Sequence, residues 1–556
     1  MFVRAKKSGR YEYLQVVRNG RVGKQIRQEV IATLGRLDVL QKTGELDALL
    51  ISCSRFADRV AVLDAVREGR VPPAEAARTG PPLVFERLWQ EAGLPQILRG
   101  LLADRHYEFS VERAVFLTVL HRLFDPGSDR AADVWRAGYA LDGMKGIELH
   151  HLYRAMAWLG EELPADEQRD ATAFAPRTTK DLVEEALFAR RRDLFSTLDL
   201  VFFDTTSIYF EGEGGETLGE YGYSRDHEPG LRQMVVAAVL DGEGHPVCCE
   251  LWPGNTTDTK TLLPVIDRLR ARFGIRSICI VADRGMVSEE AIRGLGAECR
   301  DVRFILGMRL RRSKEVRDEV LARAGRYHEV RGPRQHSKDP APLEVKEVWV
   351  GDHRYVVCLN EEEARKDARD REAILASLRE KLARGEKGLV ANRGYRRFLK
   401  TPGEARFAID EAAIEAEARY DGKWVLRTDT DLGAAEVALK YKELWRVEQL
   451  FRSIKSILET RPIYHKCDET IRGHVFCSFL ALVLLKDLFE KLEARGWSVE
   501  WENLKRDLDD LQRFTLETRG KRFLMRTAPK GDAGKALQAV GVALGPVLRL
   551  CEGKRP

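Results

Sequence analysis

Cysteine is sparse in this chain and never falls at a metal-binding spacing. The 556 residues include nine cysteines, and no two of them form a Cys-x-x-Cys pair. Cys248 and Cys249 are adjacent within a predicted strand, so their side chains should point to opposite faces of a sheet. The pattern excludes a zinc-finger site and a disulfide framework, and it is typical of a protein from a reducing cytosol.

Long hydrophobic runs are also missing. The longest apolar stretch, 475–485, includes Ser478 and is closed by His474 and Lys486. It is too short to cross a bilayer and predicts a buried helix. Charged residues begin at Arg4, so the N-terminus has no apolar core of signal-peptide length. We therefore expect a cytoplasmic protein with no membrane-spanning helix.

Charge is nearly balanced over the whole chain but not at its N-terminus. The formal net charge is +5, whereas residues 1–36 hold nine Lys and Arg against Glu12 and Glu29, a local net of +7. Such a segment suits a polyanion partner; an ordinary solvated basic surface is the alternative. The length exceeds what a single core can support and predicts about two to four domains.

The N-terminal part should begin with a hairpin and continue as helices. Segments 11–17 and 24–34 are strand-like and flank Asn19-Gly20, a strong turn signal. Beyond them, apolar residues fall at helical spacing to about residue 190, as in the segment that follows Ser110, a residue suited to cap a helix. We therefore expect a basic β-hairpin followed by helices.

The pattern changes near residue 195 to that of an α/β domain. Three strands, a helix, a strand, a helix and a strand follow in order, which predicts a mixed sheet covered by helices. The segments are 198–210, 233–240, 246–251, 257–273, 277–282, a helix from Ser288, and 302–306. Sites in such sheets tend to lie beyond the carboxyl ends of strands.

Residues 310–430 interrupt this pattern and are interpreted as a β-rich insertion subdomain. A long helix from about 432 to 460 then returns to the sheet, and a helical C-terminal region closes the chain. The insertion should contain strands at 345–350, 354–359 and 423–427 and a charged helix at 361–384. The expected division of the chain is therefore 1–190, 195–309, 310–430, 431–465 and 466–556.

Three carboxylates are placed where such a fold would gather them. Asp204 and Asp283 each end a short apolar strand, and Glu448 lies in the middle of the helix 432–460. Brought together, the three can hold two divalent metal ions, and such a site can cut and rejoin phosphodiesters. Each aspartate also has a purely structural interpretation, Asp204 as a cap and Asp283 as a turn residue.

The predicted helix around Glu448 has two adjoining faces. At roughly 100° per residue, its apolar residues form a packing stripe, and a neighbouring arc of about 80° mixes an acid, two bases and two aromatics. Glu448 and Lys455 lie roughly 10 Å apart along the axis, too far for an ion pair but suited to a metal-binding acid and a phosphate-binding lysine. An amphipathic helix with a solvated charged edge is the alternative. The residues of the mixed arc are Tyr441, Trp445, Glu448, Arg452 and Lys455.

These residues resemble the DDE transposases of bacterial insertion sequences, in the large IS-four-like superfamily. The family signature is Tyr, two residues, Arg, three residues, Glu, six residues, Lys. Tyr441, Glu448 and Lys455 match in register, whereas Leu444 stands at the Arg position. The resemblance covers about 195–490. It also rests on Asp204-Thr-Thr, Val281-Ala-Asp283-Arg-Gly, Gly222-Tyr-Ser-Arg-Asp-His227, Pro253-Gly-Asn-Thr-Thr-Asp258, Arg461-Pro-Ile-Tyr-His465 and Ile471-Arg-Gly-His474.

The resemblance implies an α/β fold with a ribonuclease H-like core and a catalytic metal site. Asp204, Asp283 and Glu448 would be the catalytic residues and would bind two Mg²⁺ or Mn²⁺ ions, for which hard oxygen ligands are suited. Trp424 or Trp349 of the insertion would stack on a flipped base, with a core aromatic as the alternative. The residues expected to contact DNA are Tyr441, Arg452, Lys455, Arg284, Trp424, Arg311 and Arg312.

The expected function is that of a transposase in the bacterial cytosol, at the nucleoid. The region 1–190 would bind the terminal inverted repeats of the protein's own insertion sequence, and the core would cut the element's ends. A synaptic homodimer would then join the 3′-OH ends to double-stranded target DNA. Two alternatives stay open: a ribonuclease H-like metal-dependent nuclease or resolvase without strand transfer, and a catalytically decayed DNA-binding protein. The presence of all three acids argues against decay.

Overall fold

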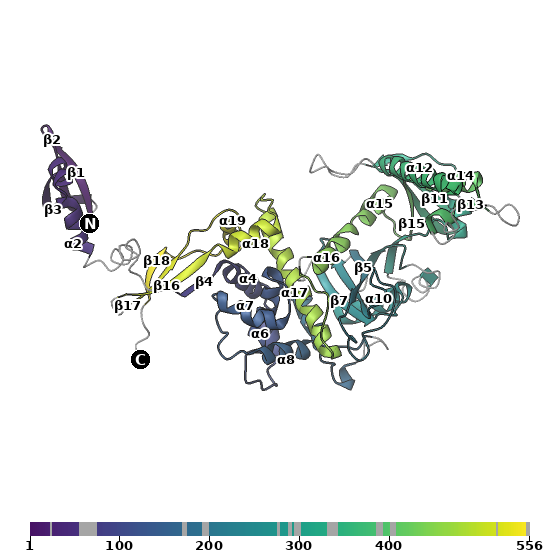
Figure 1. The fold of residues 1–556 in the computed structure, drawn as a ribbon, viewed down its shortest axis with the longest axis horizontal. Coiled ribbons are helices and arrows are strands. Elements are labelled where there is room, and N and C mark those ends of the chain that lie inside the picture. The colour runs from purple at the N-terminus through teal and green to yellow at the C-terminus, as the bar shows by residue number, and fades with distance from the viewer. Residues whose placement is uncertain are drawn as a thin grey trace. The chain divides into compact units, whose positions relative to one another are not determined.

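The computed structural model divides the chain into two compact units (Figure 1). The first comprises Met1–Gly80, Gly138–Ala140 and Glu500–Pro556, and the second comprises Pro81–Ala137 and Leu141–Val499. The structure describes residues 1–22, 25–54, 75–168, 175–191, 200–274, 278–286, 292–293, 302–330, 343–384, 393–400, 407–456, 458–518 and 521–551.

The first unit begins with an antiparallel sheet of three strands rather than a simple hairpin. The turn predicted at Asn19-Gly20 is wrong. These two residues lie inside the second strand and oppose Gln28 and Arg27, because pairing continues to Val22 and Gln25. Two irregularities in the register adjust the pairing within the sheet. The elements are β1 (Phe2–Ser8), β2 (Tyr11–Val22), β3 (Gln25–Arg36), α1 (Leu37–Thr43) and α2 (Glu45–Ser54).

A second sheet in this unit corrects the expectation of a wholly helical C-terminal region. Three strands from the end of the chain join β4 in a four-stranded sheet of order β18-β17-β16-β4. Apolar residues alternate with polar ones there, and Leu516, Phe523 and Leu548 bury a small core, which is the pattern of strands and not of helices. The elements are β4 (Glu75–Arg78), α18 (Trp501–Asp509), β16 (Gln512–Thr518), β17 (Lys521–Arg526), α19 (Ala533–Ala539) and β18 (Leu548–Cys551).

The second unit is built on a mixed sheet of nine strands in the order β10-β11-β12-β15-β9-β8-β5-β6-β7. Strand β5 is parallel to β8 and antiparallel to β6, and β8 is parallel to β9. The predicted strands and helix of this part of the chain are confirmed, and the helix expected from Ser288 falls mostly outside the described residues. The elements are β5 (Leu200–Tyr209), β6 (Gln233–Asp241), β7 (Pro246–Pro253), α10 (Leu262–Phe273), β8 (Ile278–Ala282) and β9 (Val302–Gly307).

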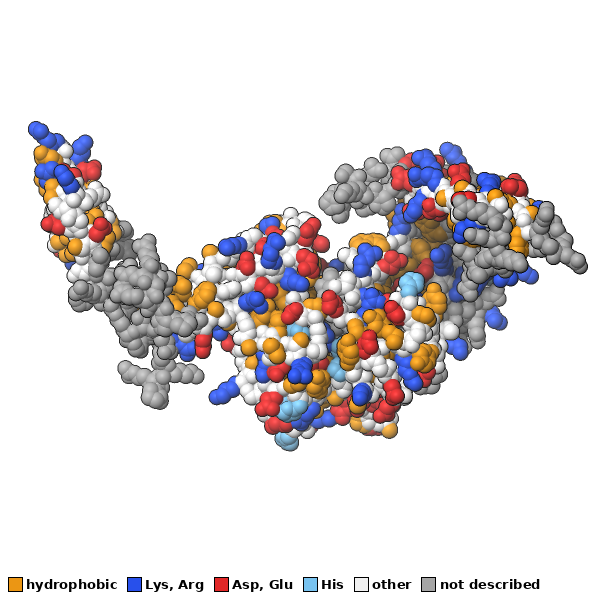
Figure 2. Space-filling model, in the orientation of Figure 1, with side chains coloured by type: hydrophobic (Ala, Val, Ile, Leu, Met, Phe, Trp, Pro, Cys, Tyr) orange, Lys and Arg blue, Asp and Glu red, His pale blue; other side chains and the backbone are white. Residues whose placement is uncertain are grey.

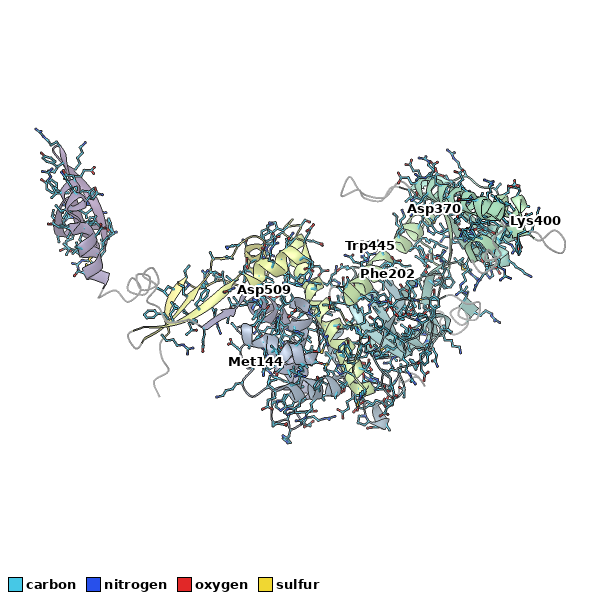
Figure 3. The ribbon with its side chains drawn as sticks, in the orientation of Figure 1. Met144, Phe202, Asp370, Lys400, Trp445 and Asp509 are labelled. Carbon is cyan, nitrogen blue, oxygen red and sulfur yellow. The ribbon has the colours of Figure 1, made fainter. Side chains whose placement is uncertain are left out.

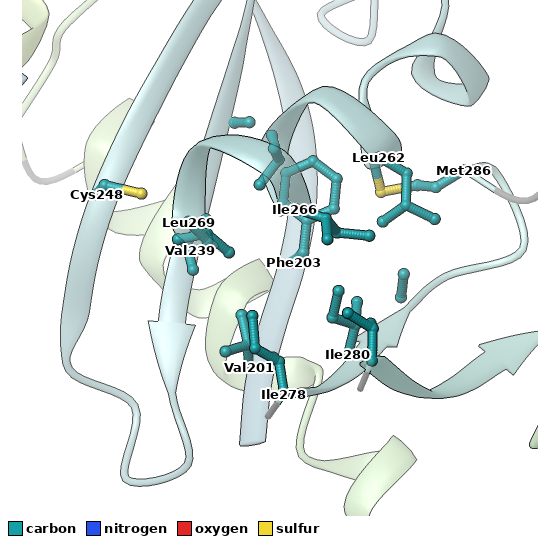
Figure 4. Close-up of a cluster of buried hydrophobic side chains, with 14 of the residues drawn as sticks. Val201, Phe203, Val239, Cys248, Leu262, Ile266, Leu269, Ile278, Ile280 and Met286 are labelled. Carbon is teal, nitrogen blue, oxygen red and sulfur yellow. The ribbon is translucent and has the colours of Figure 1, made fainter. Parts of the chain in front are cut away.

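Helices cover both faces of this sheet. Helix α10 packs on one face, where Phe203 of β5 and Ala282 of β8 join a large apolar core (Figure 4). Burial of such side chains, at about 25 cal/mol per Å², is the main force that fixes the strand register. The opposite face carries α15 (Ala434–Lys442) over β8 and β9, and α16 (Trp445–Ser456) over β5 and β6.

The segment 310–430 adds further strands to the same sheet. Strands β11, β12 and β15 follow one another beyond β9 and enclose a core that includes Tyr355 and Val425. The predicted charged helix is confirmed as α12, with the expected bounds. The elements are β10 (His328–Val330), β11 (Leu343–Val350), β12 (His353–Leu359), α12 (Glu361–Arg384), α13 (Arg393–Arg396), β13 (Leu399–Lys400), β14 (Ala408–Ile409), α14 (Glu411–Ala418) and β15 (Lys423–Thr428).

The single long helix predicted at 432–460 is wrong, because the structure has two helices there, α15 and α16. The chain breaks at Glu443-Leu444, where backbone bonds become three-residue turns, as in Arg446 N–H to Glu443 O at 3.0 Å. Tyr441 therefore belongs to α15, whereas Glu448 and Lys455 share α16. The prediction that Tyr441, Glu448 and Lys455 share one face of a single helix therefore holds only for Glu448 and Lys455.

A helical layer completes the second unit. Helix α17 is buried along most of its length, as predicted for 475–485, and packs closely on α8. A Cβ at Gly473 would lie 2.0 Å from Met156 O, so this approach needs glycine. None of the described helices is long and apolar enough to span a membrane. The elements are α4 (Gly80–Glu91), α5 (Leu94–Leu101), α6 (Val111–Phe124), α7 (Asp129–Trp135), α8 (Leu149–Gly160), α9 (Thr179–Arg191) and α17 (Asp468–Glu493).

Candidate active site

Asp204 and Asp283 lie side by side in the nine-stranded sheet. Strands β5 and β8 are parallel with Phe203 opposite Ala282. Asp283 directly follows β8, as predicted, whereas the prediction that Asp204 ends its strand is wrong, because β5 continues to Tyr209. Phe203 and Ala282 face the core under α10. Because successive side chains alternate between faces, both carboxylates turn to the other face, which α15 and α16 cover.

The surroundings of Asp204 favour a positive ion. The pKa of Asp204 is raised to about 6, mainly by burial, and the carboxylates of Asp283 and Asp258 contribute to the rise. A backbone N–H bond from Thr205 at 2.7 Å and the charge of Arg225 oppose this rise. A divalent cation would stabilise the ionised carboxylates that burial and mutual repulsion disfavour.

Tyr441 fixes the second aspartate. Its hydroxyl donates a hydrogen bond of 2.8 Å to Asp283 Oδ1. Burial and the Asp283 charge raise the pKa of Tyr441, so the hydroxyl keeps its proton and remains a donor. Gly307, at the end of β9, makes room for it, since a Cβ there would lie 2.3 Å from Tyr441 Oη.

A third aspartate belongs to this site and was not singled out from the sequence. Asp258 accepts hydrogen bonds from Thr205 Oγ1 at 2.8 Å and from Arg225 Nη2 at 2.7 Å. Arg225 Nη1 also lies 4.0 Å from Asp204 Oδ1. The available signal was that Arg225 and Asp258 stand in two of the motifs shared with insertion-sequence transposases. Both residues line an open pocket of about 360 Å³ with Arg309.

Glu448 is exposed on α16. The helix is held over β5 and β6 by its buried residues, including Val447 and Phe451, and Figure 3 labels Trp445 at its start. In the described part of the chain, two clusters have three His, Cys or acidic ligand atoms within 4.8 Å of one another. The set of Asp204, Asp283 and Glu448 is neither of these clusters. The structure thus brings Asp204 and Asp283 together and carries Glu448 on the helix that covers them.

Lys455 is tied to the same site through an ion pair. Its Nζ lies 2.8 Å from Asp226 Oδ1, and Arg461 pairs with the same oxygen. Burial lowers the pKa of Lys455, and the nearby Arg225 contributes to the lowering. Asp226 directly follows Arg225 in the chain. The ion-pair partner of Lys455 is therefore the sequence neighbour of the arginine that faces Asp204. Arg452, one turn earlier on α16, is exposed.

The other residues expected at the DNA are more scattered. Arg284 is exposed beside Asp283, and Arg312 is exposed before the π-helical turn Val316–Val320. Arg311 is engaged by Glu417 at 2.6 Å. Trp424 lies half-buried in β15 opposite Cys358. The alternative, Trp349, is 51% exposed in β11 and donates from Nε1 to Glu347 at 2.7 Å.

The two clusters of close ligands lie elsewhere in the second unit. One joins Asp129, His465 and His474. There Arg122 Nη2 lies 2.7 Å from His474 Nδ1, and a guanidinium so close disfavours a metal ion. The other cluster, with Glu108 at its centre, is partly exposed, and Glu108 pairs with Arg154. Neither cluster touches the carboxylate pair of the sheet.

Known proteins show which family this arrangement belongs to. The family model described as "Transposase DDE domain" matches residues 196–484, more than half of the chain, and the model "IS1634 family transposase, N-terminal domain" matches residues 2–66. A comparison with curated proteins finds no match. Among solved structures, the chain is similar to a piggyBac transposase in a synaptic complex with hairpin DNA, at 10% identity over 79% of this chain and 82% of that one, with a TM-score of 0.37. On the two family models, the chain belongs to the DDE transposases of insertion sequences and is a metal-dependent DNA transposase.

Proposed function

We propose that the protein binds the terminal inverted repeats of its own insertion sequence, cleaves the element's ends and joins the 3′-OH ends to target DNA. Asp204, Asp283 and Glu448 would hold two Mg²⁺ or Mn²⁺ ions. The observation that supports this most directly is the pairing of Asp204 and Asp283 in neighbouring parallel strands beneath α15 and α16. The spacing of Tyr441, Glu448 and Lys455 supports membership of the IS-four-like branch.

The residues present suit such ions. Asp204 and Asp283 offer hard oxygen donors on one face of the sheet, and the pKa of Asp204, raised to about 6 by burial and then by its acidic neighbours, reflects a local excess of negative charge. Glu448 would complete the set from α16, where its side chain is exposed. Strands β5 to β9 would form the ribonuclease H-like core, and the segment 310–430 would be its insertion.

The chain's own residues would orient the reacting groups. Tyr441 holds Asp283 by its hydrogen bond, and the Thr205 N–H does the same for Asp204. Bound metal ions supply the charge that activates the attacking oxygen and stabilises the leaving oxygen. Lys455 is paired with Asp226. A DNA phosphate that displaced the Asp226 carboxylate would bind Lys455 instead, and the lysine charge would then hold the DNA strand in position. Positioning and electrostatics then suffice, with no covalent link between enzyme and DNA.

The remaining parts of the proposal concern partners. The region 1–190, with the basic segment at its start, would hold double-stranded DNA of the element's ends. A synaptic homodimer would bring two ends together, and the protein would act in the bacterial cytosol at the nucleoid.

The test uses the full chain and a pre-cleaved element end. Wild type with Mg²⁺ or Mn²⁺ should join this end to plasmid DNA, and Asp204→Asn, Asp283→Asn and Glu448→Gln should each abolish joining. Glu443→Gln, at the break before α16, is the matched control and should retain activity. Cleavage without joining would favour the nuclease alternative, and equal activity of wild type and Asp204→Asn would refute the proposed site.

A further inference from the structure

The N-terminal sheet has one face covered by a helix and one face open. Directly opposed residues of antiparallel strands point to the same face. Leu14 opposes Gly35, and the position of a Cβ on Gly35 lies 3.4 Å from the side chain of Leu40 in α1. Helix α1 therefore packs on the Leu14 side. We call the other side the open face and define it by Arg4, Lys6, Tyr13, Gln15, Gln28 and Arg36.

Charge is sorted between the two faces. The only acidic residues in the three strands are Glu12 and Glu29, and they oppose Lys7 and Arg18 on the side of α1. Arg18 and Glu29 form an ion pair there at 2.7 Å. Among the strand residues that the structure describes, the open face therefore has cations and no carboxylate. Arg36 at its edge is paired with Asp38 of α1 at 2.6 Å, which leaves Arg4 and Lys6 as the cations that no carboxylate of the strands faces. Figure 2 shows both blue Lys and Arg and red acidic side chains over this part of the chain.

Hydrogen bonds hold the polar side chains of the open face in place. Arg4 Nη1 donates to Gln28 Oε1 at 2.6 Å and Arg4 Nη2 to Gln15 Oε1 at 3.3 Å. Gln15 in turn donates to Thr33 Oγ1 at 3.3 Å. Along β2, Val17 lies between Gln15 and Asn19, the residue that opposes Gln28. To reach Gln28, the Arg4 side chain therefore passes over Val17, which is fully buried. A guanidinium and two amides are thus fixed close together at the surface.

We propose that the open face enters the major groove of duplex DNA and reads base edges; this rests on the proposed function, because the duplex would be the element's own end. The axes of the two outer strands lie roughly 10 Å apart at the usual spacing, and a groove about 12 Å wide admits β-strands that lie along it. Arg4 suits the two acceptors of guanine, and Gln15 and Gln28 suit adenine. Lys6 is suited to a flanking phosphate.

The helices beside this sheet are poorly suited to the same task. In α1 and α2 the first turns carry Asp38, Glu45 and Asp47, and Lys42 is the only basic residue in a last turn. Acidic residues would be repelled by the phosphates on both sides of a groove. The reading element is therefore the sheet, although helices are the commoner choice in DNA-binding domains.

The experiment selects bound sequences from a pool of random duplexes with the full-length protein. Wild type should enrich one motif. Arg4→Ala combined with Gln28→Ala should abolish that enrichment, and affinity for the selected duplex relative to a scrambled one should fall about 5- to 150-fold for each base that is no longer recognised. The matched control is Lys7→Ala combined with Arg18→Ala, which removes two charges from the side of α1 and should keep the motif.

Two further variants separate base reading from charge. Arg4→Lys keeps the charge but removes the planar fork, so selectivity should fall while the salt dependence of binding stays as in wild type. Lys6→Ala should weaken binding equally on all sequences and reduce the slope of log K against log salt by about 1. Circular dichroism shows whether each variant is folded.

The proposal is overturned if the Arg4 and Gln28 variant selects the wild-type motif, if its defect equals that of the control, or if wild type selects no motif. Failure of the proposed function would look different. Metal-dependent cleavage would then be absent, or unchanged in Asp204→Asn, whatever the open-face variants do. Cleavage that depends on Asp204 together with unaltered selection would refute the open face alone.

Discussion

The Tyr441 hydroxyl and the Asp283 carboxylate are joined by a hydrogen bond of 2.8 Å between α15 and the end of β8. This bond connects the family signature on the helices to one of the two aspartates of the sheet. Tyr441 was expected to contact a DNA phosphate, but in the structure its hydroxyl is directed to the carboxylate. If Asp283 binds a metal ion as proposed, we expect this bond to position it, as groups behind metal ligands commonly do; the phosphate contact stays a prediction.

Replacing Tyr441 with Phe should weaken metal-dependent cleavage without unfolding the protein. The change removes only the hydroxyl, and losing such a supporting bond typically costs about 10- to 100-fold in metal affinity or activity. The measurement is the cleavage rate as a function of Mn²⁺ concentration. Tyr355→Phe, in the core of the neighbouring strands, is the control and should leave the curve unchanged. An unaltered curve for Tyr441→Phe would show that the bond has no catalytic role.

Gly307→Ala should produce a similar defect from the opposite side. The added Cβ would lie 2.3 Å from Tyr441 Oη and 3.0 Å from Arg284 N, so the hydroxyl must leave Asp283. We expect cleavage to fall by about the same factor of 10 to 100, and the double variant with Tyr441→Phe to be less impaired than the product of the two. Gly325→Ala, whose Cβ would meet Lys346 Cδ at an ordinary 3.5 Å, should be harmless. Strictly multiplicative rates would disprove the shared mechanism.

The sequence was sufficient to predict the strands around Asp204 and Asp283. Both aspartates follow short, continuous apolar runs typical of buried strands. Asp283 comes directly after β8, whereas Asp204 lies inside β5, which continues to Tyr209. The break between Tyr441 and Glu448 could not be predicted in the same way. The local pattern there is helical throughout, and the interruption at Glu443 appears only when α15 and α16 pack on different strands of the sheet.

Asp258 shows a second reason why sequence patterns fall short. It lies in a turn between β7 and α10, and its link to the site runs through Arg225 and Thr205, from two other segments. Such a network depends on side chains far apart in the chain, which no local periodicity reports. The C-terminal strands were missed although the segment around Leu516 alternates apolar and polar residues, because the strands are short and one pairing partner is the distant β4.

The pKa of Asp204 predicts a stability that depends on pH when no metal is present. The folded-state pKa of about 6 exceeds the ordinary value of 3.8, so the folded protein holds this proton more tightly than the unfolded chain. The resulting advantage is complete below about pH 3.8 and is lost as the pH rises through 6, at a cost of roughly 3 kcal/mol at neutral pH. Asp204→Asn removes that cost.

In EDTA at pH 7.5, Asp204→Asn should therefore unfold at higher urea concentration than wild type, and the difference should shrink toward pH 4.5. Mg²⁺ should raise the stability of wild type more than that of the variant, because the ion stabilises the ionised form. Urea titrations followed by circular dichroism at both pH values give the comparison. A variant less stable than wild type at pH 7.5 would contradict the burial inferred for this carboxylate.

A stability prediction concerns Arg272, which is buried in a network of charges behind the sheet. Its guanidinium pairs with Glu184 at 2.5 Å, with Glu250 at 3.0 Å and with Glu185 at 3.0 Å. Removing one partner of a buried ion pair leaves the other charges without compensation and typically costs about 3–5 kcal/mol. Arg272→Met should therefore lower the free energy of unfolding by that amount, as measured in urea at pH 7.5.

The control for this prediction is Arg365→Met on α12, which removes an arginine from an exposed pair with Glu361 at 2.9 Å. An exposed pair contributes little, so the change should stay within about 1 kcal/mol. Replacing Arg272 and Glu184 together, by Met and Gln, should cost less than Arg272→Met alone, because the partner that would be left unpaired is then neutral. If Arg272→Met cost no more than Arg365→Met, the network would be an incidental contact and not what joins α9 and α10 to the sheet.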